Sequence, residues 1–283
     1  MPKELDGWSL RVTPLAMRCN GNLIGSATGF FWRNESERFL VTNWHVLAGR
    51  HPKTMEALHK EGAVPDEIEY VQFIENENYD EVVRSRVRLE SGDGNPVWLE
   101  HPIHKSQVDV AAIQIPAGSL IETPHGKRYT CVYPINGDIT PLEEILLEVP
   151  PWRAIRREMG DDMFVLGFPL GLTPTGHFPI WKRASVASEM DVLLDGLPAF
   201  LIDTATREGM SGAPVIHRTF EIAHTSTGSL KPKLVDAFVG VYSGRHIGKS
   251  NEEAQLGIVW REELIREVVA LRTPGHVDLS RLP

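Results

Sequence analysis

Three side chains that lie far apart in the sequence have the chemistry needed for nucleophilic catalysis: His45, Asp109 and Ser211. His45 follows an apolar run that predicts a strand, so the backbone before it is rigid while its ring is free to face a cleft, as a general base requires. Asp109 interrupts another apolar run, where an ionised carboxylate is costly unless it is paired. A packed structural histidine and a turn-capping aspartate are the alternative interpretations.

Ser211 lies in the segment Arg-Glu-Gly-Met-Ser-Gly-Ala-Pro-Val, residues 207–215. Acyl transfer needs backbone N–H groups turned toward a developing oxyanion, and a glycine before the nucleophile permits that backbone shape. We therefore predict that the N–H groups of Gly209 and Ser211 form an oxyanion hole. A simple Ser/Gly turn between two strands is the alternative. The strand–serine–helix turn of α/β-hydrolases is excluded, because a strand pattern follows Ser211.

The order of the three residues favours catalysis over the structural alternatives. Histidine, then aspartate, then serine is the order of the chymotrypsin class, and it differs from the subtilisin and α/β-hydrolase orders. The intervals from 45 to 109 and from 109 to 211 leave room for one β-barrel that carries His45 and Asp109 and a second that carries Ser211.

Short segments of strand-forming residues, separated by Gly, Pro, Asn and Asp, must position these side chains. Strands are predicted at 26–32, 38–44, 68–74, 82–89, 108–115, 163–168, 184–188, 199–203, 213–217 and 236–243. A stripe of apolar residues predicts a helix near the C-terminus, at 261–271. Residues 51–62 could form a short helix or a loop insertion, and 142–148 is ambiguous. Many short strands with few helices favour a barrel or a sandwich.

Composition limits the classes of partner and compartment. The 283 residues carry a net charge of −9, which is unfavourable for general nucleic-acid binding. No apolar run approaches the roughly 20 residues of a membrane helix. The first residues lack the apolar core of a signal peptide, so we expect a cytoplasmic protein with no membrane partner. The two cysteines, Cys19 and Cys131, are expected to be small buried side chains.

We expect no cofactor and no metal. His101 and His104 are close in the sequence, but no thiolate or acid follows them at the spacing of a zinc site.

The chain resembles the trypsin-like serine peptidases, in particular the disulfide-poor bacterial branch that includes HtrA-type proteins. The motifs that carry the resemblance are Thr28-Gly29-Phe30, Leu40–Val46 (Leu-Val-Thr-Asn-Trp-His-Val), Asp109-Val110-Ala111, Val165–Gly171 (Val-Leu-Gly-Phe-Pro-Leu-Gly), Asp203 before the nucleophile loop, and Val239–Gly244 (Val-Gly-Val-Tyr-Ser-Gly).

This resemblance implies an all-β fold of two six-stranded antiparallel β-barrels, chymotrypsin-like, with a C-terminal α-helix. The expected boundaries are 8–118 for the N-terminal barrel, 119–160 for the connection, 161–260 for the C-terminal barrel and 261–272 for the helix. The chain after Arg261 is too short for a PDZ module, so that peptide-sensing domain of the family is not expected.

The resemblance also implies a specificity pocket. Ala205 and Thr206 would form one wall, and Tyr242, Ser243 and Gly244 another, with Gly257 near the base. No acid falls at the pocket bottom, so small or medium apolar side chains fit better than Lys or Arg. Glu208 and Arg245 would lie at the rim.

Two departures from the family pattern concern activation. Met210 stands where the family has Asn or Asp directly before the nucleophile, and Ala213 replaces the second glycine after it. In secreted trypsins that aspartate binds a newly formed N-terminal amine, which methionine cannot do. Activation of that kind is therefore not expected.

The resulting hypothesis is a serine endopeptidase that acts on a protein or peptide substrate through an acyl-enzyme intermediate. Met210 leaves two alternatives open. One is an inactive trypsin-like domain that binds a peptide or protein, and the other is a peptidase held idle until a regulatory partner orders the Ser211 loop.

Overall fold

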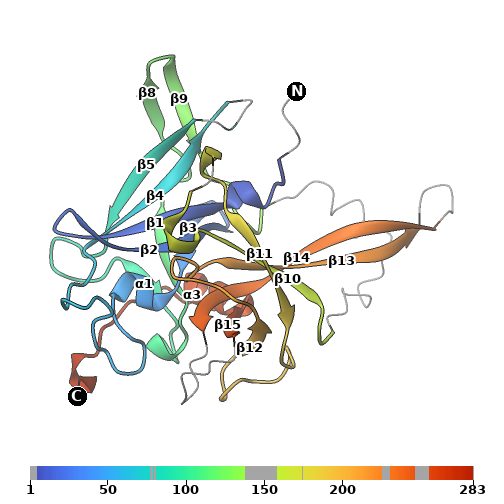
Figure 1. Ribbon diagram of the computed structural model, residues 1–283. Helices are drawn as coiled ribbons and strands as arrows, with labels where there is room; N and C mark the ends of the chain where they lie inside the picture. The colour runs from blue at the N-terminus through green and yellow to red at the C-terminus, as the bar shows by residue number, and fades with distance from the viewer. Residues whose placement is uncertain are drawn as a thin grey trace.

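The computed structural model describes residues 5–76, 79, 81–137, 158–173, 175–224, 230–245 and 255–282. Its chain forms two antiparallel β-structures, an extended sheet in the N-terminal half and a closed barrel in the C-terminal half (Figure 1). The predicted all-β class is confirmed in this coarser form, and both β-structures contribute walls to the candidate site.

The N-terminal sheet has ten strands. They are β1 (Val12–Cys19), β2 (Asn22–Asn34), β3 (Glu37–Thr42), β4 (Glu67–Ile74), β5 (Val82–Arg88), β6 (Trp98–Glu100), β7 (Ala111–Ile115), β8 (Leu120–Thr123), β9 (Gly126–Cys131) and β16 (Thr273–Pro274). Their order is β16-β6-β7-β3-β2-β1-β4-β9-β8, and β5 pairs with β4 beside this path. The predicted six-stranded N-terminal barrel is therefore wrong: in the described residues this sheet stays open.

The reason lies at the two ends of the sheet. At one end β16 pairs with the outer edge of β6, through Thr273 with Glu100 and Pro274 with Leu99. At the other end β5 pairs with β4 from Glu67 with Arg88 to Phe73 with Val82, and the β8–β9 hairpin adds to the opposite edge of β4 through Phe73 with Cys131. Among the described residues β5 and β16 do not pair with each other, so the sheet does not close. This hairpin also occupies the first part of 119–160, which was expected to connect two barrels.

The C-terminal half is the closed six-stranded barrel that the sequence predicted. Its strands are β10 (Asp162–Gly167), β11 (Ile180–Val186), β12 (Ala199–Asp203), β13 (Pro214–His224), β14 (Leu230–Arg245) and β15 (Leu256–Arg261). They close in the order β10-β11-β12-β15-β14-β13. Strands β13 and β14 pair along their whole length from Pro214–Val241 to His224–Leu230 and extend well beyond the barrel (Figure 1).

Helices are short and few among the described residues. They are α1 (Trp44–Ala48) and α3 (Glu263–Leu271), with 3₁₀ turns at Ser9–Arg11, Lys105–Gln107, Pro169–Gly171, Thr175–His177 and Leu279–Arg281. The helix predicted at 261–272 is α3, which begins two residues later. Residues 51–62 form a loop, and the ambiguous segment 142–148 lies outside the described residues.

Apolar packing joins the two halves into one unit. One cluster fills the N-terminal sheet and another fills the barrel. A third contains Phe30 and Val41 from the sheet, Leu166 and Val241 from the barrel, and the buried face of α3. That helix presents Leu264, Ile265, Val268 and Val269 to this cluster. The shared core fixes the relative position of the two β-structures, and the candidate site lies where they meet.

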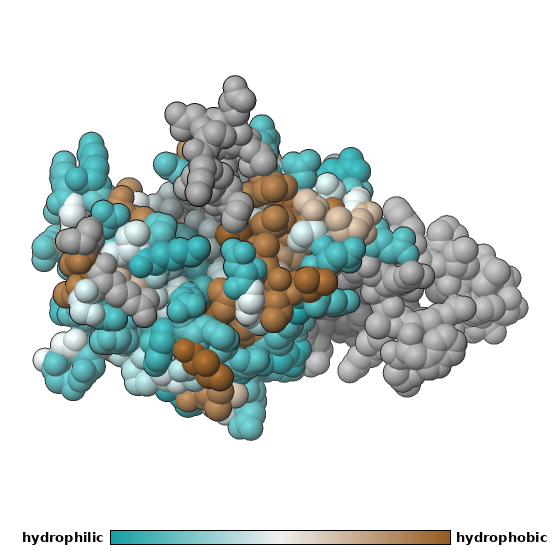
Figure 2. Space-filling view, turned by 90° about the horizontal axis from the view of Figure 1, so that it is seen from below, coloured by the Kyte–Doolittle hydropathy of each residue, from teal (hydrophilic) through white to brown (hydrophobic). Residues whose placement is uncertain are grey.

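The surface is mixed in polarity. Seen from below, it is largely hydrophilic, with a band of hydrophobic surface across its middle (Figure 2). In the part of the chain that the structure describes, no helix is long and apolar enough to cross a membrane.

Candidate active site

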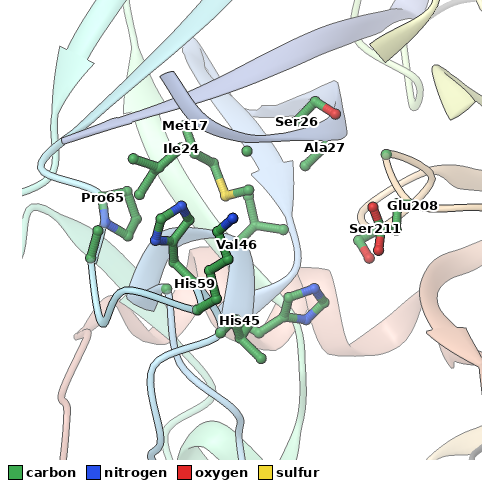
Figure 3. Close-up of a pocket in the computed structure, with 16 residues that line it drawn as sticks. Met17, Ile24, Ser26, Ala27, His45, Val46, His59, Pro65, Glu208 and Ser211 are labelled. Carbon is green, nitrogen blue, oxygen red and sulfur yellow. The ribbon is translucent and has the colours of Figure 1, made fainter. Parts of the chain in front are cut away.

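A cleft of about 680 Å³ lies where the N-terminal sheet meets the Ser211 loop. His45 and Ser211 both line it, and Figure 3 shows the two side chains on facing sides. Among the described residues no hydrogen bond joins the Ser211 hydroxyl to the His45 ring. The two predicted catalytic side chains are therefore brought to one cleft without being in direct contact.

His45 is held by the first turn of α1. Strand β3 ends at Thr42, Asn43 is extended, and the helix begins at Trp44. The neighbours Trp44 and Val46 are buried in the sheet core, which leaves the His45 side chain 17% exposed toward the cleft. The histidine thus lies just inside a short helix rather than at the end of a strand, and its position is fixed by buried residues on both sides.

Asp109 lies directly behind His45. Its Oδ2 is 2.6 Å from His45 Nδ1, and its Oδ1 accepts a hydrogen bond from the His45 backbone N–H at 2.9 Å. The hydroxyl of Ser243 donates to Oδ2 at 2.5 Å. The side-chain amide of Asn43 donates to the backbone carbonyl of Asp109 at 2.7 Å. These contacts hold the imidazole in one orientation, with Nε2 facing away from the carboxylate.

The environment keeps Asp109 ionised. Burial raises the pKa of this carboxyl, but the His45 ring and the hydrogen bonds from His45 and Ser243 outweigh it, so that the pKa lies below its usual value. An ionised carboxylate accepts a hydrogen bond from Nδ1–H and so selects the tautomer in which Nε2 can accept a proton. That is the state a general base needs.

Ser211 lies in the loop between β12 and β13, whose shape depends on two glycines. Gly209 has φ of +89° and Gly212 has φ of +83°. A Cβ on Gly209 would lie 2.4 Å from the carbonyl oxygen of Phe168, and one on Gly212 would lie 2.2 Å from the carbonyl oxygen of Thr28. Positive φ and close backbone contact therefore both require glycine here.

Thr28 in β2 ties this loop to the other half of the molecule. Its backbone N–H donates to the carbonyl of Ser211 at 2.8 Å. Its hydroxyl donates to the carbonyl of Gly209 at 2.7 Å and accepts the N–H of Phe168 at 3.1 Å. The sequence placed Thr28 in a family motif but gave it no role, because the three partners are remote in the chain.

The two amides predicted for the oxyanion hole are available. Within the described residues, the N–H groups of Gly209 and Ser211 donate no hydrogen bond to the protein. Their neighbours do: Met210 N–H donates to the Arg207 carbonyl at 3.3 Å, and Ala213 N–H donates to the Met210 carbonyl at 3.0 Å. The turn that holds the loop together thus leaves these two N–H groups unused.

Met210 anchors the Ser211 loop to the core of the barrel. Its side chain is completely buried and belongs to the apolar core of the barrel. Its sulfur would be 3.0 Å from a Cβ built on Gly167, so it packs closely on β10. An apolar contact therefore occupies the place where the family resemblance leads one to expect a polar side chain.

The residues predicted for the specificity pocket lie together, but Tyr242 fills the space among them. Its ring is so close to Gly257 that a Cβ there would be 2.4 Å from the Tyr242 Cε2. Its hydroxyl is hydrogen-bonded to Thr206 Oγ1, and both side chains are 1% exposed. Ala205 is exposed.

Other predicted residues have different places. Gly244 faces Ser211, since a Cβ there would lie 4.0 Å from the Ser211 hydroxyl. Ser243 contacts Asp109 as well as belonging to the predicted wall. Glu208 lines the cleft, and the side chain of Arg245 lies outside what the structure describes.

The His101 ring makes hydrogen-bond contacts within the fold. The Nε2 of His101 lies 2.8 Å from a carboxylate oxygen of Glu267, and its Nδ1 accepts the backbone N–H of His104 at 3.0 Å. In the described part of the chain, no three potential metal ligands of the His, Cys, Asp and Glu types gather at one place.

Comparison with known proteins places the chain in a family. The family model described as "Trypsin-like peptidase domain" matches residues 27–222, more than half of the chain. The comparison with curated proteins found no match.

Solved structures of proteases are similar at low identity. The serine endoprotease from Yersinia pestis shares 13% identity at a TM-score of 0.46, over 93% of this chain and 62% of that one, so that this chain spans less than two thirds of its length. The active form of the Rv3671c protease from M. tuberculosis shares 17% identity at a TM-score of 0.41, over 93% and 80% of the two chains. The inactive form of the Rv3671c protease shares 17% identity at a TM-score of 0.40, over 93% of this chain and 89% of that one. On the family match, which covers residues 27–222, the chain belongs to the trypsin-like peptidases.

Proposed function

We propose that this peptidase hydrolyses peptide bonds with Ser211 as nucleophile, His45 as general base and Asp109 as the residue that orients His45. Ser211 Oγ attacks the scissile carbonyl while His45 Nε2 takes its proton. His45 then donates that proton to the leaving amine, and an acyl-enzyme forms on Ser211. Water attacks the acyl-enzyme with His45 again as base, which releases the acid product and restores the serine.

The observation that carries this proposal is the pairing of His45 with Asp109 at the edge of the cleft that Ser211 lines. The distance of 2.6 Å between Nδ1 and Oδ2 is that of a charge-assisted hydrogen bond. It joins residues from two different motifs. Because Nδ1 is bound to Asp109, Nε2 is the ring nitrogen that can exchange a proton with a group in the cleft. A merely structural histidine would have no need of a buried carboxylate on one side and an open cleft on the other.

The N–H groups of Gly209 and Ser211 are proposed to bind the oxyanion of the tetrahedral intermediates. Preorganised N–H donors stabilise charge that appears only in the transition state, and loss of one such donor typically slows the reaction by about 10²–10³-fold. Support comes from the free state of both amides among the described residues. The positive φ of Gly209 belongs to the same loop geometry.

Activation is proposed to proceed without a new N-terminal amine. The completely buried Met210 side chain holds the loop through apolar contacts, and it offers no charge for an amine to pair with. The loop is fixed further by Thr28, which binds the carbonyls on either side of Met210. The Ser211 loop therefore has its anchors within the described fold.

A fluorophosphonate probe tests the proposal directly, because it reacts only with a serine that has an assembled base and oxyanion hole. Wild-type protein should be labelled promptly, and Ser211→Ala should lose both labelling and cleavage of a casein substrate. Ser36→Ala, which changes an exposed serine in the turn between β2 and β3, is the matched control and should behave as wild type. Unchanged cleavage by Ser211→Ala protein would show the assignment to be wrong.

A second candidate function is a peptidase held idle until a regulatory partner binds. The observation in its favour is that no hydrogen bond joins Ser211 to His45 within the described residues. In resting enzymes this contact is often long and tightens only with substrate, so the first proposal explains it more simply. Absence of labelling in purified wild-type protein, together with labelling in extract, would favour the partner-dependent candidate.

A further inference from the structure

The cleft at the candidate site is much larger than catalysis itself requires, and most of it lies on one side of His45. Its apolar lining comes from the β1–β2 hairpin, from α1 and from the loop between α1 and β4. These lining residues are Met17, Ile24, Ala27, Val46, Leu58, Ala63 and Pro65. Figure 3 shows Met17, Ile24 and Pro65 around the part of the cleft remote from Ser211. None of the six residues predicted for the specificity pocket lines it.

The direction of a bound polypeptide follows from the chemistry. The carbonyl under attack must lie over Ser211 with its oxygen toward Gly209 N–H, and the leaving nitrogen must lie near His45, which protonates it. The residues that follow the scissile bond therefore continue past His45. Past His45 lies this cleft, in which the apolar side chains are accompanied by His59 and Lys60.

The loop between α1 and β4, which forms one wall of the cleft, is held in place by internal contacts. A Cβ on Gly49, which has φ of +62°, would lie 2.2 Å from the Cδ of Pro65, so the two ends of the loop are in tight contact. The N–H of Leu58 donates to the Gly49 carbonyl at 2.9 Å. Met55 is 1% exposed and fixes the middle of the loop to the sheet core. Leu58 itself remains 52% exposed at the cleft.

Among the residues that the structure describes, the opposite side of the site offers little room. The space predicted to take the side chain that precedes the scissile bond contains the Tyr242 ring, which packs on Gly257 and is hydrogen-bonded through its hydroxyl to Thr206. With Tyr242 only 1% exposed, a large substrate side chain cannot enter without displacing it. Recognition on this side is therefore limited to small residues.

We propose that this enzyme selects its substrates chiefly on the leaving-group side, where the cleft binds an apolar side chain of the polypeptide segment that follows the scissile bond. The residue before that bond is small. This inference rests on the proposed function, since it uses Ser211 and His45 to fix the direction of the chain. It goes further by identifying the lining of the leaving-group cleft, with Leu58 as its exposed apolar contact, as the determinant of specificity.

A panel of internally quenched peptides tests the inference on the full chain. Leu and Ser are exchanged at the first and second positions after a fixed cleavage site, and Ala and Phe are exchanged at the position before it. We expect kcat/KM to be about tenfold or more higher for a Leu than for a Ser after the site, the range that one apolar contact supplies. We expect Phe before the site to be cleaved more slowly than Ala.

Two variants assign the preference to the cleft. Leu58→Ser should reduce the preference for Leu after the site, whereas Leu120→Ser should leave it unchanged. Leu120, in β8, has the same 52% exposure as Leu58 and lies outside the cleft lining, so the pair controls for loss of a surface leucine.

Fluorophosphonate labelling separates failure of this inference from failure of the proposed function, because the probe needs Ser211 and His45 but not the leaving-group cleft. Labelled protein whose selectivity follows the residue before the bond, or is unchanged in Leu58→Ser, overturns the inference alone. Protein that is neither labelled nor able to cleave any peptide overturns the inference together with the proposed function.

Discussion

The hydroxyl of Thr28 in the N-terminal sheet donates a hydrogen bond of 2.7 Å to the carbonyl of Gly209 in the loop of the C-terminal barrel. The same hydroxyl accepts the N–H of Phe168 at 3.1 Å, and Thr28 is completely buried. One side chain thus joins the half that carries His45 to the loop that carries Ser211. We expect the spacing between the proposed base, His45, and the proposed nucleophile, Ser211, to depend on this contact across the interface.

Thr28→Val should weaken both the fold and the reaction. Valine has nearly the same shape, so it leaves the Gly209 carbonyl and the Phe168 N–H buried without their partner, at a cost of about 1–3 kcal/mol. We expect a lower free energy of unfolding in denaturant titration and slower fluorophosphonate labelling. Thr28→Ser keeps the hydroxyl and should retain most of the labelling rate. Equal labelling by the valine and serine variants would contradict the role of this hydrogen bond.

Met210 should be needed for its size and not for any charge. Met210→Ala removes a completely buried side chain from the barrel core and should lower the free energy of unfolding by about 2–5 kcal/mol. Met210→Leu conserves the volume and should cost less than about 1.5 kcal/mol. Denaturant titration measures both changes. A short extension at the N-terminus should leave labelling of Ser211 unchanged, and loss of labelling would instead point to a role for the terminal amine.

The pairing of His45 with Asp109 could be predicted because the residues on either side of each one in the sequence show that it needs a partner. An aspartate in an apolar run needs a partner, and a histidine after a strand needs an orienting group. Their motif order then indicated which residues meet. The barrel strands of the C-terminal half other than β15 were predictable for a similar reason, since alternating and β-branched residues mark them directly.

Features that depend on contacts between remote segments were not predicted. Strand β1 was missed because Pro14 interrupts its pattern, yet β4 pairs only with Leu15–Arg18, so the proline is not required to donate to that neighbour. Strand β15 was missed because Gly257 weakens its pattern. The position of the Tyr242 ring within the predicted specificity pocket could not be predicted from the sequence, because it depends on which way one side chain points.

The carboxyl of Asp109 should make stability depend on pH in the acid range. Its pKa is lower in the folded protein than in the unfolded chain, so its contribution is present above the unfolded value and is lost as the pH falls through the folded value. The difference in free energy of unfolding between wild type and Asp109→Asn should therefore shrink as the pH falls below about 4, the ordinary pKa of an aspartate. A difference that grows on acidification would contradict this assignment.

Asp109→Asn should also abolish most of the activity at neutral pH. The asparagine side-chain NH2 can donate a hydrogen bond to Nδ1, whereas the carboxylate only accepts one from Nδ1–H, so the amide favours the wrong tautomer of His45, and a loss of about 10⁴-fold in kcat is expected. The quenched-peptide assay measures this directly. A loss of less than about tenfold would show that Asp109 does not orient the base.

Gly212 should not tolerate a side chain. A Cβ there would lie 2.2 Å from both the Thr28 carbonyl oxygen and the Thr42 hydroxyl, and φ is +83°, so Gly212→Ala should shift the Ser211 loop and lower both labelling and the free energy of unfolding. Gly92→Ala is the control, because nothing lies within 4 Å of its Cβ position and its φ is not positive. We expect that variant to be as stable as wild type or slightly more stable.

Tyr242→Ala should change which residue is accepted before the scissile bond. Removing the ring empties the space against Gly257, and the vacated volume can then take a large apolar side chain of the substrate. In the peptide panel, the ratio of kcat/KM for Phe over Ala before the site should therefore rise by about tenfold or more, while the preference for Leu after the site persists. The backbone hydrogen bonds of Tyr242 with Gly212 and Ala213 do not involve the ring, so the Ser211 loop keeps these supports.

Loss of a ring that is 1% exposed will lower the free energy of unfolding by about 3–5 kcal/mol. The assay is therefore run at a temperature well below the unfolding midpoint of this variant. An unchanged ratio in protein that is still labelled at Ser211 would show that Tyr242 does not limit this side of the site.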